Sequence, residues 1–281
     1  MIGDIHALLS RHLPHYEVRS LTESGRGLDN VVYEVNGELI VRHGRAADPE
    51  ATRREAELLA VVAELSTLPV PEVVFSDPEA AVIAYAKLPG RSLDRHPVAE
   101  PVRLAEPLGG FLSALHGAEP GTMLDLAPLD AYPAPTLLHD AELEYLDVAA
   151  HVPERHRPLI ESFLGAAPPP EPTSPRFCHN DLGAEHLLAD PASGELTGVI
   201  DWTDAAVTDP AHDFALIYRD LGPEVFERTL SHYDGRLDDA GRARVLFYAR
   251  CALIEDLAYG LSTGPRHYAD AALAHLAHTF A

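Results

Sequence analysis

The sequence predicts an α+β fold in two parts, a small β-rich part over residues 1–87 and a larger helical part over residues 88–281. Three observations lead to this prediction. The length of 281 residues is enough for about two domains. Short β-prone runs bounded by turn residues dominate the first part. From Leu88 onward, apolar residues recur at the spacing of an amphipathic helix.

Composition and charge exclude several classes of protein. Hydrophobic residues make up 46% of the chain and charged residues 23%, which argues against disorder. Asp and Glu number 44 against 21 Lys and Arg, and the net charge of −23 makes a nucleic-acid partner unexpected. Such a charge would attract a cationic small molecule, or it could serve solubility alone.

No membrane partner and no disulfide scaffold are expected. The chain has no apolar run of 18 residues, and residues 1–13 lack the pattern of a secretion signal, so we expect a cytoplasmic protein. Cys178 and Cys251 lie far apart and not in a paired-ligand spacing, which also argues against structural zinc.

A β-hairpin is the first clear element. After a short helix, two β-prone runs, Val31–Val35 and Glu38–Val41, flank Asn36-Gly37. Asn-Gly is the strongest short signal for a hairpin turn. A glycine-bearing loop, residues 24–30, is expected just before the first of these strands.

A helix and two more strands should complete the first part. Asp48 and Pro49 suit the N-cap and the first residue of a helix, and Pro69 follows its end. Strands are expected over Glu72–Phe75 and Ala81–Ala86. The apolar residues that share one face of the helix are Leu58, Val61, Val62 and Leu65.

The second part should be helical with one β-hairpin. Weaker helices are expected around Leu143–Val148 and Leu159–Leu164, and the proline-dense Ala166–Pro175 is typical of a connector. Leu187-Leu188 and Leu196–Ile200 should pair as a hairpin. A clear helical face precedes them, formed by Leu104, Leu108, Phe111, Leu112 and Leu115. Helices should follow Asp209-Pro210 to the end of the chain, with one face made of Leu246, Leu253, Ile254 and Leu257.

Residues 177–214 carry the most informative chemistry. Asp181 lies in a loop after an apolar strand, and His186 lies where the chain enters the hairpin that ends at Asp201. Because a hairpin returns its ends to one place, His186 and Asp201 can converge. Mg²⁺ commonly takes only one or two protein carboxylates beside phosphate and water. Asp181 would then be free to orient a substrate hydroxyl and accept its proton.

Several motifs together resemble the aminoglycoside phosphotransferase family, which has a protein-kinase-like fold. HNDLGAEHLL and GVIDWTDAAVTDPAHDF, residues 179–188 and 198–214, are most similar to the aminoglycoside 2''-phosphotransferases, with macrolide phosphotransferases as close relatives. ESGRGLDNVVYEV resembles the nucleotide loop with its hairpin, and ELIVRHGR resembles the strand of the phosphate-contacting lysine. RREAELLAVVAEL with LPVPEVVF resembles the small-lobe helix and its following strand, and AYAKLPGRSL resembles the hinge. The resemblance implies a nucleotide-binding N-lobe over 1–87 and a C-lobe over 88–281 with the catalytic loop.

The resemblance also implies roles for single residues of the second part. Asp181 would be the catalytic base, and His186 and Asp201 the Mg²⁺ ligands. His179 would brace the catalytic loop, and Asp213 would be structural.

In the first part, the resemblance implies contacts to ATP or GTP. Arg42 stands where the family has its phosphate-contacting lysine. Arginine is always charged and forks onto phosphate, but it is not a geometric copy of lysine. Glu55 would hold this side chain. The other nucleotide contacts are expected from the glycine loop and the hinge: Ser24, Gly25, Gly27, Ala84, Tyr85, Ala86 and Lys87.

Recognition of the acceptor is the point where the sequence departs from the family. Arg219 stands where an acidic residue is expected, and only Asp220 remains of the carboxylates there. Glu255 and Asp256 could supply acidic contacts, or they could be a solvated helix face. Residues 118–175 are expected to wall one side of the acceptor pocket.

The implied activity is transfer of the γ-phosphoryl group of ATP or GTP, with Mg²⁺, to a hydroxyl of an aminoglycoside-like antibiotic. The alternatives are a macrolide or another small hydroxylated acceptor, and a nucleotide-binding homologue without catalysis, which Arg42 would favour. A protein kinase is disfavoured because an Ala-Pro-Glu segment and a recognisable activation loop after Asp201 are lacking. The expected partners are a nucleoside triphosphate and a small acceptor, which could be cationic.

Overall fold

The computed structural model describes residues 2–26, 30–46 and 48–281. The chain divides into two compact units, Met1–Pro89 and Gly90–Ala281. This division lies two residues beyond the boundary expected from the sequence. The first unit is built on an antiparallel sheet and the second is mainly helical, so the α+β class is as predicted.

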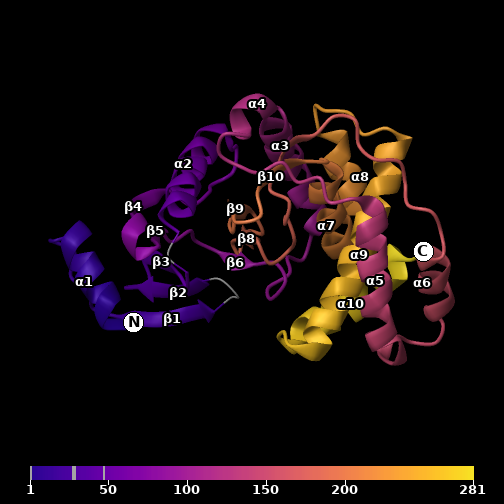
Figure 1. Ribbon diagram of the computed structural model, residues 1–281, viewed down its shortest axis with the longest axis horizontal. Coiled ribbons are helices and arrows are strands. Elements are labelled where there is room, and N and C mark those ends of the chain that lie inside the picture. The colour runs from indigo at the N-terminus through magenta and orange to yellow at the C-terminus, as the bar shows by residue number, and fades with distance from the viewer. Residues whose placement is uncertain (1, 27–29, 47) are drawn as a thin grey trace. The chain divides into compact units, whose positions relative to one another are not determined.

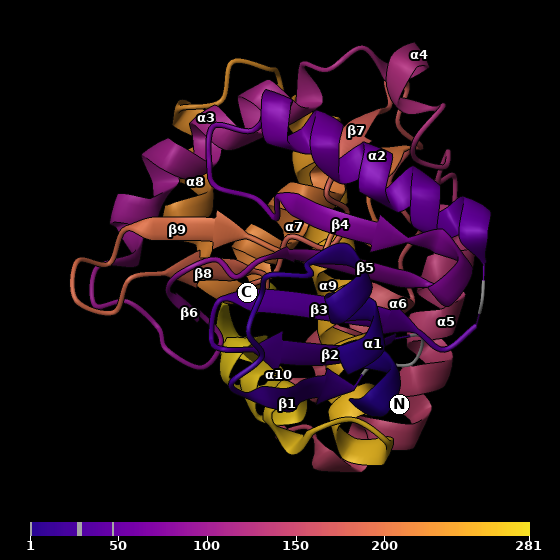
Figure 2. The ribbon, with the colours of Figure 1, turned by 90° about the vertical axis from the view of Figure 1, so that its left-hand side faces the viewer.

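The first unit contains a five-stranded antiparallel sheet in the order β1-β2-β3-β5-β4 (Figure 2). Its strands are β1 (Leu21–Arg26), β2 (Asn30–Val35), β3 (Leu39–Gly44), β4 (Val73–Asp77) and β5 (Val82–Ala86). The predicted hairpin is β2 and β3, with φ of 55° at Asn36 and 75° at Gly37. Both angles are left-handed, which explains Asn-Gly at this turn. Glu38 belongs to the turn, so β3 starts one residue later than expected.

Two helices pack on opposite faces of this sheet. Helix α1 (Ile2–His12) lies across the strands in Figure 2. The core that it forms with the sheet is Ile5, Leu8, Leu9, Val31, Tyr33, Val35, Leu39, Val41, Val82 and Ala84. Helix α2 (Pro49–Leu65) begins as predicted, because the Asp48 carboxylate accepts the N–H groups of Glu50 and Ala51. Side chains alternate along a strand, so Arg42, next to the core residue Val41, points toward α2.

Short sheets frame the candidate site in the second unit. Strands β6 (Arg91–Ser92), β8 (Leu187–Ala189) and β9 (Leu196–Val199) form one sheet, and β7 (Arg176–Cys178) pairs with β10 (Ala206–Thr208). The predicted hairpin is therefore β8 and β9. Its turn is held by the Asp190 carboxylate, which accepts the N–H groups of Ala192 and Ser193.

Helices make up the rest of the second unit (Figure 1). They are α3 (Ala105–His116), α4 (Pro120–Met123), α5 (Ala134–Val148), α6 (Arg157–Leu164), α7 (Ala211–Leu221), α8 (Pro223–Ser231), α9 (Asp239–Ser262) and α10 (Arg266–Thr279). Short 3₁₀ helices span Pro78–Ala80, Pro101–Leu104 and Ala149–His151. Helix α7 is central, because it packs against α8, α9 and α10. None of the helices in the described part of the chain is long and apolar enough to span a membrane.

Candidate active site

The loop between β7 and β8, residues 179–186, is held in place by helix α7. The buried carboxylate of Asp213 accepts the N–H of Asn180 at 2.7 Å and the N–H of His179 at 3.1 Å. His116 Nε2 lies 3.0 Å from the same carboxylate. Burial would raise the pKa of Asp213, but the hydrogen bond and charge of His116 offset it and hold the pKa below its usual range. Asp213 is therefore an ionised acceptor that fixes the start of the loop.

His179 joins this loop to the end of the hairpin. Its Nδ1 accepts the N–H of Asp181 at 3.3 Å, so the proton is on Nε2, which donates to the carbonyl of Ile200 at 3.0 Å. Burial lowers the pKa of His179 to about 4, which keeps the ring neutral. The ring thus links the residues beside Asp181 and Asp201, the bracing position that the resemblance implied.

The structure brings Asp181, His186 and Asp201 together. His186 Nδ1 lies 2.7 Å from the Asp181 carbonyl oxygen and donates to it. This hydrogen bond fixes the ring so that Nε2 faces Asp201, with Oδ2 at 3.8 Å. The side chain of His186 is only 13% exposed, whereas those of Asp181 and Asp201 are 36% and 50% exposed. Two reachable carboxylates therefore flank an oriented imidazole.

The carboxyl of Asp181 is suited to accept a proton near neutral pH. Burial raises its pKa to about 6, with the charge of His186 opposing and those of Glu185 and Asp204 adding to the rise. A general base works best when its pKa lies close to the operating pH. At pH 7 most of this carboxyl is ionised and ready to act.

The residues around His186 fit a divalent cation. Asp181, Glu185 and His186 each offer a ligand atom, and these atoms lie within 4.8 Å of one another. Burial lowers the pKa of His186, but Asp181, Glu185 and Asp201 together raise it above its usual value. A site that favours a proton on His186 in this way also favours a metal cation, and Mg²⁺ would take oxygen from the carboxylates.

Sequence reasoning missed Glu185 in this group. It lies in the same loop as Asp181, immediately before His186, and its carboxylate accepts a 2.5 Å hydrogen bond from the Tyr268 hydroxyl. The acidic residue directly before a proposed metal ligand was the available signal. A separate buried group, His116, Cys178 and Asp213, could also hold a metal by distance, but Asp213 is already engaged by the loop.

The first unit holds the expected partners Arg42 and Glu55 together. The Arg42 guanidinium forms an ion pair with the Glu55 carboxylate, and the side chains are 12% and 23% exposed. Glu55 thus lies where it can orient the guanidinium. Contact of Arg42 with phosphate stays a prediction.

The structure differs from the expected nucleotide loop at its first two residues. Ser24 and Gly25 belong to strand β1, where Gly25 pairs with Val32, and the Ser24 hydroxyl donates to the Val32 carbonyl at 3.3 Å. The ladder continues through them because a bulge after Glu23 absorbs the irregularity. Gly27 lies outside the described residues.

The expected hinge residues already take part in strand and hydrogen-bond contacts within the first unit. Ala84 and Tyr85 lie within strand β5, and Ala84 is fully buried. The N–H of Ala86 donates to Glu72 and that of Lys87 to Glu38. These two N–H groups are therefore used within the first unit, and contact of this segment with a nucleotide base stays a prediction. The Lys87 ammonium lies 2.7 Å from a Glu34 carboxylate oxygen, so its charge is also paired.

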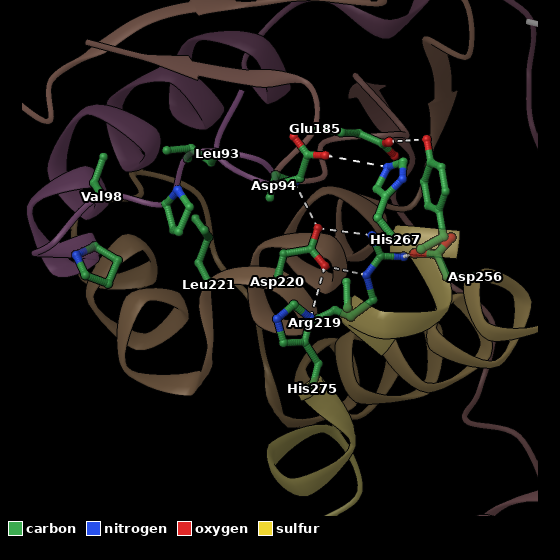
Figure 3. A pocket seen from close by; sticks show the side chains of 15 residues that line it. Leu93, Asp94, Val98, Glu185, Arg219, Asp220, Leu221, Asp256, His267 and His275 are labelled. Atoms are coloured by element: carbon green, nitrogen blue, oxygen red, sulfur yellow. Dashed lines mark hydrogen bonds and ion pairs between the residues drawn. The ribbon is translucent and has the colours of Figure 1, made fainter. Parts of the chain in front are cut away.

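A cavity of about 350 Å³ opens beside the loop of residues 179–186 in the second unit (Figure 3). Its polar wall includes Glu185, Asp220 and Asp256, and its apolar wall includes Leu93 and Val98. The lining residues come from the segment after β6, from the loop, and from helices α7, α9 and α10. Glu255, the third expected acceptor residue, is exposed on α9 and does not line this cavity.

The expected acceptor residues Asp220 and Asp256 both pair with Arg219. Arg219 Nε lies 2.6 Å from Asp220 Oδ1, and Nη1 lies 2.9 Å from Asp256 Oδ2. The Asp220 side chain is 9% exposed and also accepts the Ala184 N–H. Contact of Asp220 with an acceptor therefore stays a prediction: its carboxylate lines the cavity but already binds Arg219 and the Ala184 N–H.

Comparison with known proteins places this site in a family context. Residues 20–248 match the profile of the Phosphotransferase enzyme family. A segment of 56 residues is 45% identical to protein YcbJ of Bacillus subtilis (strain 168), covering 20% of this chain and 18% of that protein. A segment of 55 residues is 38% identical to viomycin phosphotransferase of Streptomyces vinaceus, covering 19% of each. The chain therefore aligns with less than a fifth of the length of these relatives.

Solved structures are similar over almost the whole chain. The GDP complex of aminoglycoside 2'-phosphotransferase-IIIa has a TM-score of 0.74 at 20% identity, covering 99% of this chain and 98% of that one. Macrolide 2'-phosphotransferase MphH from Brachybacterium faecium has a TM-score of 0.65 at 24% identity, covering 98% and 97%. A ternary complex of streptomycin, ATP and APH(2'')-IIa has a TM-score of 0.64 at 18% identity, covering 100% and 98%. These similarities confirm the fold that the resemblance implied.

Proposed function

The chain belongs to the Phosphotransferase enzyme family, and on that premise we propose that it transfers the γ-phosphoryl group of ATP or GTP to a hydroxyl of a small molecule. The observation that carries this proposal is the convergence of Asp181, His186 and Asp201 on one loop and hairpin. A nucleotide-binding homologue without catalysis would have no need of all three. The nucleotide-bound complexes among the structural neighbours support a nucleotide donor.

In this proposal the second unit performs the chemistry. Asp181 orients the acceptor hydroxyl and takes its proton as the phosphoryl group is transferred. His186 and Asp201 would hold Mg²⁺, with Glu185 near enough to His186 to assist, and the cation would neutralise charge on the phosphates. His179 and Asp213 keep the loop backbone in place.

The first unit binds the nucleotide in this proposal. Arg42, steadied by Glu55, contacts the phosphates, and the strand end at Ala84–Lys87 lies beside the base. Phosphoryl transfer depends on positioning and charge neutralisation more than on covalent help. The fork of Arg42 therefore suits the task even though it replaces a lysine.

An aminoglycoside-like antibiotic is the acceptor we favour, and a macrolide is the second candidate. Structural neighbours include aminoglycoside and macrolide phosphotransferases. The net charge of −23 favours a cationic acceptor. The pairing of Arg219 with Asp220 and Asp256 reduces the negative charge at the cavity, which leaves the less cationic macrolide in consideration.

The test is product formation with a panel of acceptors. The protein is incubated with Mg²⁺, ATP or GTP, and aminoglycosides, macrolides or viomycin, and products are weighed by mass spectrometry. We expect one acceptor class to gain a single phosphoryl group, and we expect chelation of Mg²⁺ to stop the gain. Nucleotide binding without a phosphorylated product would direct the search to other hydroxylated acceptors, and a lack of nucleotide binding would refute the proposal.

A further inference from the structure

Arg219 forms two buried ion pairs next to the loop of residues 179–186. Its side chain is 8% exposed and lies between the carboxylates of Asp220 and Asp256, as Figure 3 shows. Nε and Nη2 form a fork on Asp220, at 2.6 and 3.0 Å, while Nη1 reaches Asp256 at 2.9 Å. A forked pair of this kind fixes direction as well as charge.

Asp220 connects Arg219 to the loop of residues 179–186 through a hydrogen bond. Its Oδ2 accepts the N–H of Ala184 at 2.9 Å. Ala184 lies three residues after Asp181 and two residues before His186, so the hydrogen bond holds the backbone between the proposed base and a proposed metal ligand. Helix α7 thus contacts the loop twice, through Asp213 at its start and Asp220 farther along. These residues are seven apart, which places both on one face of the helix.

The backbone at Gly183 fits closely against the same ion pair. A Cβ atom at this position would lie 3.1 Å from Asp220 Oδ2 and 3.4 Å from Arg219 Nη2. Glycine therefore allows the loop to approach the ion pair closely enough for the Ala184 hydrogen bond to form.

The acceptor role of Asp220 depends on Arg219. A buried carboxylate without a cation is strongly destabilised. Burial would raise the pKa of Asp220, but the charge and hydrogen bonds of Arg219 offset it and hold the pKa below its usual range. Burial likewise works against the charge of Arg219, yet Asp220 and Asp256 raise its pKa above the ordinary value. Arg219 and Asp220 therefore keep each other ionised, whereas burial raises the pKa of Asp256 to about 7.

We propose that Arg219 is a positioning residue, which acts through Asp220 to hold the loop backbone between Asp181 and His186. Arg219 stands where related enzymes were expected to place an acceptor-binding acid, and in this chain the structure gives that position to support of the loop. The catalytic consequence rests on the proposed phosphoryl transfer, whereas the effect on the loop backbone does not.

The test compares Arg219→Gln with the double variant Arg219→Gln/Asp220→Asn. In the single variant the Asp220 carboxylate loses the guanidinium and keeps only the more distant His275 ring, at 3.7 Å, as a basic neighbour. We therefore expect the Ala184 amide to exchange its hydrogen about tenfold faster or more. The turnover number should fall about a hundredfold because small misplacements at a reacting centre are costly, while the KM for nucleotide stays within about twofold. The double variant keeps an uncharged oxygen that accepts the Ala184 N–H, so it should recover most of both losses.

Arg242→Gln is the matched control. Arg242 forms a similar fork on Glu227, at 2.5 and 3.1 Å, but this pair is exposed and involves helices α8 and α9 only. Its loss should leave exchange at Ala184 and the turnover number unchanged. Gly183→Ala provides a second route if Arg219→Gln folds poorly, because it pushes the loop away with the ion pair intact. It should also speed exchange at Ala184.

Two results would overturn the proposal. One is wild-type exchange at Ala184 in a folded Arg219→Gln variant. The other is faster exchange throughout the second unit that the added Asp220→Asn change does not reverse, which would mean a general loss of stability. If the wild-type protein phosphorylates no acceptor, the proposed function fails, and the exchange measurements still decide the role of Arg219.

Discussion

The loop of residues 179–186 in the second unit and the charged pair of the first unit are held in different ways. In the loop, the buried carboxylates of Asp213 and Asp220 bind backbone N–H groups directly. In the first unit, Arg42 and Glu55 are partly exposed and hold each other through side chains. Backbone anchoring fixes the position of the proposed base, whereas a side-chain pair can rearrange around a ligand.

This difference in anchoring predicts different consequences of mutation. Loss of a buried carboxylate leaves loop amides and a histidine without partners, so both stability and chemistry should suffer. Loss of the Arg42–Glu55 pair, which is only partly exposed, should remove less stability because no backbone N–H group depends on it for an acceptor. Substitutions in the second unit should therefore lower turnover, and those in the first unit should mainly weaken nucleotide binding.

The largest expected effect is that of Asp213→Ala. Two buried loop N–H groups and His116 lose their acceptor, so we expect a loss of about 3 kcal/mol or more in the free energy of unfolding. Denaturant titration followed by fluorescence of Trp202 measures this loss. Asp190→Ala is the control, because Asp190 also accepts two N–H groups but in a solvent-facing turn. Equal losses for the two variants would contradict the contrast between buried and exposed anchors.

Glu55→Gln should affect the nucleotide more than stability. Arg42 loses the charge that orients it, so we expect the KM for ATP or GTP to rise about tenfold with a smaller change in turnover number. The free energy of unfolding should change by less than about 1 kcal/mol. Glu57→Gln, on the exposed side of the same helix, provides the control. A fall in turnover with an unchanged KM would assign Glu55 a different role.

Asp77→Ala should give the smallest effect, and one that depends on pH. Asp77 pairs with His12 and Arg11 and accepts the Ala80 N–H, so its removal should cost about 1 kcal/mol at pH 7. The hydrogen bond from His12 is the main cause that holds the pKa of Asp77 below its usual range. The carboxylate therefore stabilises the fold above its unfolded pKa, and this contribution disappears as the pH falls through the folded pKa.

Unfolding curves of the wild type and Asp77→Ala at pH 7 and in acid test this dependence. The difference between the two proteins should shrink in acid. A difference that grows as the pH falls would show that the ionised carboxylate is not the source of the stability.

Local sequence signals predicted much of the fold and the core of the site. Asp48-Pro49 and Asn36-Gly37 act through bonds and angles within a few residues, and both begin or turn elements as expected. His186 and Asp201 could be paired because the hairpin between them was readable. These cases share one property, which is that the relevant partners are close in sequence or joined by a simple turn.

The remaining features depend on partners distant in sequence. Asp220 was expected to contact an acceptor, which stays a prediction, and its hydrogen bond with Ala184, from a loop 36 residues earlier, was not foreseen. Arg219 meets Asp256 from another helix, and Glu185 meets Tyr268. The N–H groups of Ala86 and Lys87 likewise donate to carbonyl oxygens of distant residues, Glu72 and Glu38. Residue type and spacing indicate which groups are present, and tertiary packing decides which of them remain open to a ligand.

The proposed reaction requires Asp181 to take the proton while other residues hold the nucleotide. The most direct measurement is single-turnover phosphoryl transfer by Asp181→Asn, with nucleotide affinity measured on the same preparation. We predict a rate lowered by about 10²- to 10⁴-fold, with nucleotide affinity within about twofold of wild type. A near-normal rate of transfer in this variant would contradict the account.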